Sequence, residues 1–161
     1  MTSLVDDLGG KPVARVVGTQ IQTNAVNAAL ANGTLGHSED FDDYGAGHQA
    51  VTLMPVVLAL GEELNASGKQ ALLAYAVGFD ITAAVTQSMG HDHYGKGWHN
   101  TSSIGTLGST AAAAKMLNLD EMQTRMALGI GATQASGLRG NFGTMTKPFH
   151  PGNTCRAAVT A

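Results

Sequence analysis

Cysteine, charge and aromatic side chains are all scarce in this sequence. The single cysteine, Cys155, excludes an internal disulfide framework and is typical of a reducing compartment. Charged residues make up 13% of the chain and the formal net charge is −3, with no run of lysine or arginine. Such a composition gives no general attraction to a phosphate backbone, so we expect no nucleic-acid partner.

Long hydrophobic runs are also absent. The longest apolar stretch, residues 71–79, ends at Asp80 and is far too short to span a bilayer. The segment from Met1 to Asp7 lacks the basic start and apolar centre of a signal peptide. We therefore expect a soluble, cytoplasmic protein with no membrane partner.

Glycine, in contrast, is abundant, and much of it lies in segments with helical periodicity. The chain has 21 glycines, and inside a helix each costs about 1 kcal/mol relative to alanine. Close approach between helix backbones would offset that cost. Hydrophobic residues make up 43% of the 161 residues, enough for one buried core. The predicted fold is all-α, a helical bundle.

The first part of the chain predicts an arm followed by a helix. Residues 1–18 carry turn residues around one short apolar run, which predicts an N-terminal arm or a short strand. Residues 19–35 have apolar side chains at helical spacing, with Thr23 or Asn24 as the capping residue. We expect this helix to pass its Asn-Gly pair and to continue into the acidic stretch that follows.

Two later helices are marked by capping patterns. Ser67 followed by Gln70 predicts a helix to about Met89 that is apolar on nearly all sides, as expected of a central helix. Asp120 followed by Gln123 predicts another, to about residue 136.

Small residues predict a close pairing between two of the helices. The facing positions would be Gly105, Ser109 and Ala112 on one helix and Gly129, Thr133 and Ser136 on the other.

Residues 137–151 have no helical period and are predicted to form a loop. Residues 154–161 begin like a helix and carry no stop signal, so we expect the molecule to be part of something larger.

An acidic stretch, residues 37–44, follows the first long helix. Four carboxylates at the C-terminal end of a helix would oppose the macrodipole, because that end carries partial negative charge. Asp40 and Asp43 would lie one turn apart on such a helix. A solvated helix end is one interpretation, and a functional role for at least one carboxylate is the other.

The segment around His99 predicts a proton-transfer site. His99 follows the only tryptophan, Trp98, and precedes Asn100–Ser103, a cluster of helix-capping residue types. A helix N-terminus presents unpaired N–H groups that suit a carboxylate or phosphate. An imidazole with an ordinary pKa of about 6.5 can move protons there at neutral pH. The alternative is a surface or capping histidine.

Other histidines suggest a metal site as an alternative. His91-Asp92-His93 can supply two metal ligands, and together with His48 and Asp120 its order is similar to that of helical metal-dependent phosphohydrolases. The spacings are not diagnostic, and no His-Glu-x-x-His helix or cysteine cluster accompanies them.

The segment 137–151 carries the donors that an anionic substrate needs. Arg139, Asn141 and Lys147 lie among few apolar residues, where surface solvation is the alternative. A buried carboxylate requires such partners because an unpaired buried charge is costly.

Three ordered motifs stand out: Asn-Gly-Thr-Leu-Gly-His-Ser-Glu-Asp-Phe-Asp-Asp at 32–43, Gly-Trp-His-Asn-Thr-Ser at 97–102, and the stretch from Gln-Ala-Ser-Gly to Thr-Lys-Pro-Phe-His at 134–150. Together they resemble the MmgE/PrpD family, which includes 2-methylcitrate dehydratase and cis-aconitate decarboxylase. The resemblance implies a helical domain with a smaller α+β lid domain, usually in a homodimer. It also implies small di- or tricarboxylate substrates and no metal or organic cofactor.

The resemblance also assigns site residues. It implies catalytic roles for Asp40, His99 and His48, the last in a loop that is shorter than usual and begins with Tyr44 in place of a common threonine. Lys147 matches the lysine of the family's Thr-Lys-Pro motif. We expect substrate to be bound by Lys147 together with Arg139, Asn141 and Thr101.

Length is the main departure from the family pattern. Members of the family are much longer, so we expect residues 19–161 to be part of the helical domain, without the lid. This leaves two hypotheses for the chain: a contribution to lyase chemistry, by dehydration or decarboxylation, or a non-catalytic helical fragment.

Overall fold

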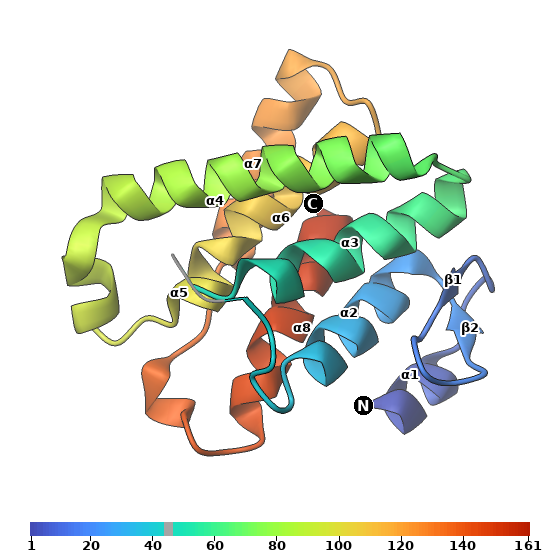
Figure 1. Cartoon of the computed structure of the whole chain (residues 1–161), viewed down its shortest axis with the longest axis horizontal. Coiled ribbons are helices and arrows are strands. Elements are labelled where there is room, and N and C mark those ends of the chain that lie inside the picture. Colours follow the sequence, from blue (N-terminus) through green and yellow to red (C-terminus); the bar gives the residue numbers. More distant parts are fainter. Residues whose placement is uncertain (44–46) are drawn as a thin grey trace.

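The computed structural model describes residues 1–43 and 47–161, and most of them are helical. The helices are α1 (Thr2–Leu8), α2 (Ala25–Gly36), α3 (Gln49–Leu64), α4 (Gly68–Gly95), α5 (Asn100–Ser103), α6 (Gly105–Met116), α7 (Glu121–Gln134), the 3-10 turn η1 (Arg139–Asn141) and α8 (Thr146–Thr160). Strands β1 (Ala14–Arg15) and β2 (Gln22–Thr23) form one short antiparallel pair. The all-α prediction is confirmed (Figure 1).

The N-terminal segment is more ordered than a simple arm. Strand β1 occupies part of the expected extended run, and the sequence did not predict helix α1 before it. Val5 of α1 and Val16 beside β1 are fully buried against Leu30 and Ala31 of α2. Apolar packing on α2 therefore holds this segment against the helices.

The predicted helix starts are confirmed where a capping side chain was identified. Asn24 caps α2 by accepting a hydrogen bond from Asn27 N at 2.8 Å. Ser67 with Gln70 and Asp120 with Gln123 form reciprocal capping boxes at α4 and α7. Helix α2 also passes Asn32 and Gly33 as expected, but it ends at Gly36 and does not continue into the acidic stretch.

Helix α6, rather than α4, is the central helix. Nearly every residue of α6 is buried, whereas α4 buries only Ala74, Gly78 and Thr82 and lies along one edge of the molecule (Figure 1). The two helices are in close contact at Gly108, where an added Cβ would lie 2.7 Å from Gly78 O. The prediction of a central α4 was wrong because small residues, not large apolar ones, permit the closest packing.

The predicted partner of α6 was also only partly right. Gly129 of α7 faces open space, whereas a Cβ on Gly131 would lie 2.4 Å from Thr110 Oγ1 of α6. Gly105 approaches Thr52 of α3 instead of α7. The small residues of α6 thus allow three neighbouring helices, α3, α4 and α7, to approach it closely, rather than α7 alone.

Helix α8 overturns the prediction of a loop over residues 137–151. It begins at Thr146 and continues through Pro151, with residues 154–160 as its second half. Pro148 lies in the first turn, where the missing N–H has no helical partner in any case. Pro151 has no backbone N–H, so one hydrogen bond of helix α8 is missing there. Burial of this turn against α2 offsets the loss.

Helices α2 and α8 lie side by side, although the chain between them is long (Figure 1). A Cβ on Gly152 would lie 2.6 Å from Leu30 O, and one on Gly33 would lie 2.9 Å from Gly152 Cα. These glycines allow the two backbones to meet. No helix among the described residues is both long and apolar enough to cross a membrane.

Candidate active site

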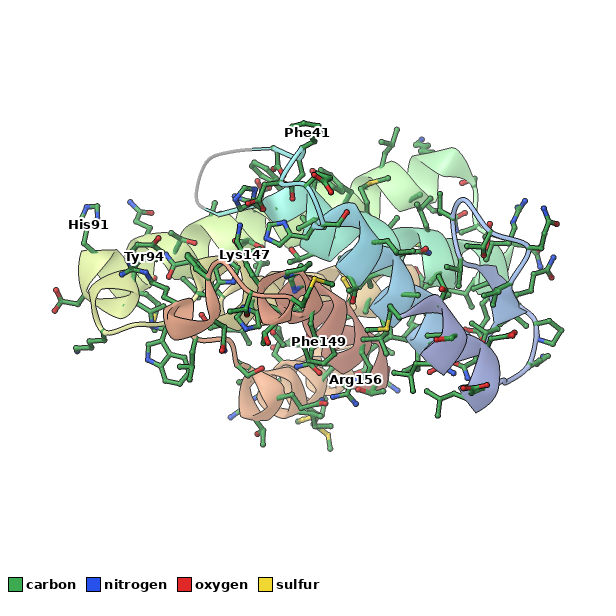
Figure 2. All side chains as sticks on the ribbon, turned by 90° about the horizontal axis from the view of Figure 1, so that it is seen from below. Phe41, His91, Tyr94, Lys147, Phe149 and Arg156 are labelled. Carbon is green, nitrogen blue, oxygen red and sulfur yellow. The ribbon has the colours of Figure 1, made fainter. Side chains whose placement is uncertain are left out.

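The acidic segment precedes a helix start instead of extending a helix end. Asp43 Oδ1 accepts a hydrogen bond from Ala50 N at 2.8 Å, in the first turn of α3. This is the favourable end for a carboxylate, because the helix N-terminus carries partial positive charge. Asp40 has a φ of 55°, a left-handed conformation. Phe41 beside it projects into solvent and is 96% exposed (Figure 2). Residues 44–46, and with them Tyr44, lie outside the described part of the chain.

Asp42 lies between His48 and His37. Its Oδ1 is 2.8 Å from His48 Nδ1, and its Oδ2 is 3.3 Å from His37 Nδ1. His37 is 1% exposed, and its Nδ1 is also 3.2 Å from Asp40 Oδ1. Neither approach to His37 has hydrogen-bond geometry, so within residues 1–43 and 47–161 both of its buried ring nitrogens lack a hydrogen-bond partner. Burial lowers the pKa of His37, while the charges of Asp42 and Asp40 act in the opposite direction.

Lys147 of α8 reaches across to this segment and forms an ion pair with Asp40. Its hydrogen bond is the main reason that the pKa of Asp40 lies below its usual value. The ammonium group also lies 5.4 Å from the centre of the Phe142 ring. The pair joins residues that are 107 positions apart, so the fold alone brings these two charges together.

His99 and His150 form a second, more deeply buried pair. Their Nδ1 atoms are 3.0 Å apart, and the residues are 4% and 6% exposed. The backbone N of His99 donates to Gly137 O at 3.0 Å, which fixes the start of α5. Burial is the main cause that lowers the pKa of His99 to about 3, with His150 as the next cause. Burial also lowers the pKa of His150, so both rings are neutral at physiological pH.

A cavity of about 990 Å³ collects several of these side chains. Four of the predicted site residues line it: His48, His99, Thr101 and Lys147. Asn100, Phe142 and the end of α4 complete much of the wall. Asp40 is connected to the cavity through Lys147. The side chains expected to act on a carboxylate therefore come from α5 with its N-cap residue His99, from α8, and from the segment before α3.

Arg139 and Asn141 are not among the lining residues of this cavity. The Arg139 guanidinium lies 3.8 Å from the centre of the Tyr94 ring, and its Nη1 donates to Tyr94 O at 2.9 Å. Arg139 thus connects η1 to the end of α4. The structure does not bring these two residues together with Lys147 in the cavity wall.

The complete chain, residues 1–161, matches the model of the MmgE/PrpD N-terminal domain. The chain belongs to the MmgE/PrpD family. It is 38% identical to human cis-aconitate decarboxylase over 141 residues, which cover 83% of this chain and 29% of the human protein. It is 32% identical to Aspergillus terreus cis-aconitate decarboxylase over 152 residues, 88% of this chain and 31% of the fungal protein. The chain thus spans less than a third of the length of these relatives.

In this MmgE/PrpD chain, the donor atoms that could hold a metal belong to His37, Asp40, Asp42 and His48. Their ligand atoms lie within 4.8 Å of one another. The ammonium group of Lys147 already provides a positive charge at Asp40, and the donor set would have to give up this ion pair to bind a metal through Asp40 Oδ2.

The residues of the phosphohydrolase alternative do not form such a group. His48 and His91 both line the large cavity, but Asp92 does not. Asp120 caps α7 by accepting from Gln123 N at 2.8 Å. Among the described residues, the clustered donors are those of the acidic segment.

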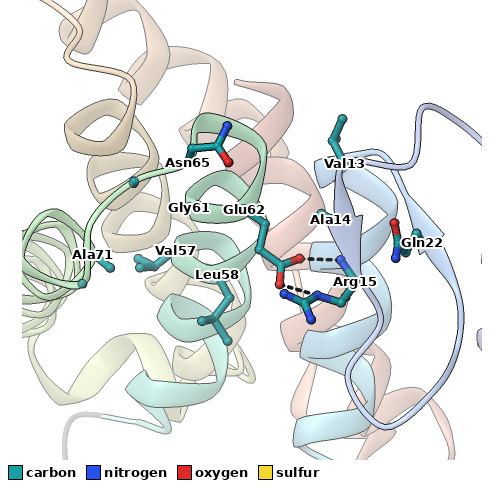
Figure 3. A pocket seen from close by; sticks show the side chains of 12 residues that line it. Val13, Ala14, Arg15, Gln22, Val57, Leu58, Gly61, Glu62, Asn65 and Ala71 are labelled. Atoms are coloured by element: carbon teal, nitrogen blue, oxygen red, sulfur yellow. Dashed lines mark hydrogen bonds and ion pairs between the residues drawn. The ribbon is translucent and has the colours of Figure 1, made fainter.

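A smaller hollow of about 660 Å³ lies between the β1–β2 hairpin and α3 (Figure 3). Arg15 and Glu62 are paired across it, with Nε and Oε1 2.8 Å apart. The two charges bind each other, so this hollow is a weaker candidate for a carboxylate site than the cavity at Lys147.

The sequence did not identify His37, Asp42 or His150 as members of the site. Lys147 and His150 are separated by three positions, which places both on one helical face. That spacing would have indicated their proximity, but the prolines favoured a loop. Asp42 is one of four neighbouring carboxylates in the sequence, and only its contact with His48 in the folded segment sets it apart from the others.

Proposed function

We propose that this chain contributes a carboxylate-binding site for lyase chemistry, with cis-aconitate as the first candidate substrate and loss of CO₂ as the first candidate reaction. The observation that carries the proposal is the position of Lys147, His48 and His99 around one cavity. The cation can pair with the negative charge of a substrate carboxylate. An imidazole can carry the proton that the substrate carbon takes up when CO₂ leaves.

Lys147 would bind a substrate carboxylate. Its side chain is 18% exposed, so an incoming anion can reach it, and Asp40 holds it in place. A carboxylate in a partly buried site needs such a hydrogen-bonded cation. Thr101 and Asn100 line the wall next to His99 and would orient the rest of the substrate.

His99 was expected to act as a general acid or base. Its lowered pKa of about 3 makes the protonated ring unfavourable, so its first role would be that of a neutral hydrogen-bonding group beside the reacting atoms. Dehydration of 2-methylcitrate would use the same groups and stays the alternative reaction. Neither reaction would require a metal or organic cofactor.

The test is a thermal-shift titration of the purified chain with cis-aconitate, citrate and 2-methylcitrate. A ligand that binds only the folded state stabilises it, by about 2.7 kcal/mol at a concentration of 100 Kd. We expect a saturable shift that is lost in Lys147→Ala. Lys115→Ala is the matched control, because Lys115 lies on the exposed side of α6.

A cooperative melt that no carboxylate shifts would contradict the proposal. That outcome would favour the non-catalytic helical fragment.

We also propose that the protein is cytoplasmic and forms a homodimer. The buried thiol of Cys155 suits a reducing compartment, and light scattering measures the assembly state.

A further inference from the structure

Asp42 is buried where its charge needs a specific partner. The side chain is 11% exposed, and its Oδ2 has no hydrogen-bond partner in the part of the chain that the structure describes. Its Oδ1 has one, at His48 Nδ1, 2.8 Å away. A buried carboxylate is costly unless its neighbours compensate the charge. The contact with His48 is therefore the main polar interaction that Asp42 makes at hydrogen-bond geometry.

His48 is fixed from two directions. It directly precedes α3, and its backbone N donates to Thr101 Oγ1 at 3.1 Å, which connects it to α5. Its ring is held at Nδ1 by Asp42. Both His48 and Thr101 line the large cavity, so a ring with little freedom is placed at the wall where substrate is proposed to bind.

The contact determines where the hydrogen on the ring must be. A charged carboxylate only accepts hydrogen bonds, so His48 Nδ1 must carry the hydrogen. In the neutral ring, Nε2 then has a free lone pair, and no side chain or backbone hydrogen bond is made to it among the described residues. When Nε2 takes up a proton, Asp42 supplies the opposite charge.

His99, which also lines the cavity, has no such carboxylate neighbour among the described residues. His99 Nδ1 faces the Nδ1 of a second imidazole, His150, and either ring can be the donor. No carboxylate contacts His99 or His150 among the ion pairs of the described residues. His48 and His99 thus differ in what holds them, although both are located at helix starts.

We infer that Asp42 is a positioning residue that holds His48 with Nδ1 protonated, so that His48 Nε2 exchanges the proton with the substrate. This inference rests on the proposed function for the identity of the substrate. The role of Asp42 is to orient the ring and to fix its tautomer, and it does not itself touch the substrate.

The proton transfer balances as follows for a decarboxylation. The C–C bond to the leaving carboxylate breaks, CO₂ departs, and the electron pair stays on the remaining carbon skeleton. The protonated His48 gives the hydrogen on Nε2 to that carbon, and a C–H bond forms. His48 is left neutral with its Nδ1 hydrogen still bonded to Asp42, and solvent returns a proton to Nε2.

The direct test is nitrogen NMR of the histidine rings in the isotope-labelled chain, which distinguishes a protonated from an unprotonated ring nitrogen. His48→Gln identifies the signals of His48. In the wild-type protein with the His48 ring neutral, we expect protonated Nδ1 and unprotonated Nε2. A wild-type His48 with hydrogen on Nε2 instead would overturn the inference without any variant.

Asp42→Asn is the second arm. An amide NH₂ can donate to Nδ1, so the tautomer should change toward hydrogen on Nε2. Asp43→Asn makes the same change of charge in the same segment, but Asp43 bonds Ala50 N, so it should leave the His48 signals unchanged. An identical tautomer in Asp42→Asn and the wild type would also overturn the inference.

Turnover of cis-aconitate tests the consequence for chemistry. In Asp42→Asn we expect kcat to fall by about 100-fold or more with KM nearly unchanged, and Asp42→Glu to recover part of the loss. A changed tautomer with unchanged kcat would overturn the role of His48 in proton transfer. If wild-type protein fails to bind cis-aconitate, the proposed function falls, while the NMR result still decides whether Asp42 positions His48.

Discussion

Residues that line the cavity belong to two clusters of side chains, a charged side reached through His48 and Lys147 and a neutral side reached through His99. The charged side consists of His37, Asp40, Asp42, His48 and Lys147, where carboxylates and a cation are in contact. The neutral side consists of His99 and His150 with the buried hydroxyls of Ser102 and Thr154, which are 2.9 Å apart. The comparison shows that the neighbours, rather than the residue type, determine what a histidine can do with a proton.

The largest expected difference between the two sides is in turnover. We expect His48→Ala to lower kcat for cis-aconitate by about 100-fold to 10,000-fold, because it removes the proposed proton carrier. His99→Ala should have a smaller effect, since its ring acts as a neutral group. Steady-state kinetics of both variants compare the sides directly. An equal or greater loss in His99→Ala would reverse the assignment.

In the proposed function, substrate affinity depends on the charged side. Lys147→Met should weaken cis-aconitate binding by about 10-fold to 100-fold, the effect of losing a charged hydrogen bond of about 1.5–3 kcal/mol. Lys147→Arg keeps the positive charge and should retain most of the affinity. Calorimetric titration measures both. Equal affinity in the wild type and Lys147→Met would remove Lys147 from the binding site.

Stability depends more on the neutral side. His150→Leu leaves His99 Nδ1 buried and unpaired, so unfolding should become easier by about 1–3 kcal/mol. Adding His99→Leu removes both partners and should recover part of this loss, because apolar replacement of a complete polar pair can be nearly neutral. Urea unfolding of the single and double variants measures the coupling. Strict additivity would mean that the pair contributes nothing.

Acid should destabilise the fold through the neutral side. His99 stays neutral when folded down to its pKa of about 3, whereas the unfolded chain takes up this proton near pH 6.5. The unfolded state therefore binds more protons in this window. As the pH is lowered, the free energy of unfolding decreases by about 1.4 kcal/mol per pH unit for this group. Unfolding midpoints between pH 7 and 5 measure the slope.

A matched pair of variants identifies the source of that slope. His99→Gln should flatten it, while His91→Gln, at an exposed position near the end of α4, should leave it in place. Equal slopes in the two variants would show that another group dominates the acid response.

Much of the helical framework could be predicted from sequence, because its starts are local. Asn24, Ser67 and Asp120 each form the cap that their sequence context indicates. The burial of helices could not be predicted in this way. Leu72 of α4 is 72% exposed although its helix has an apolar sequence, because Gly78 and Gly108 determine which face of α4 meets α6.

The site was predictable as a set of residue types but not as a set of contacts. His48, His99 and Lys147 were expected in one site and do line one cavity. The pairing of Asp42 with His48, and of His99 with His150, depends on how separate segments meet in the fold. Arg139 was expected beside Lys147, but its guanidinium stacks on Tyr94, a contact that no local pattern indicates.

The packing of α2 against α8 has a consequence for how the molecule is made. Asp40 and Lys147 are 107 positions apart, so their contact closes a long loop, which is typical of slow folding steps. On the ribosome, the face of α2 that packs against α8 lacks this partner until α8 has been synthesised. The proposed carboxylate site includes Lys147 of α8, so we expect it to form late, and a chaperone that shields α2 would act before that site exists.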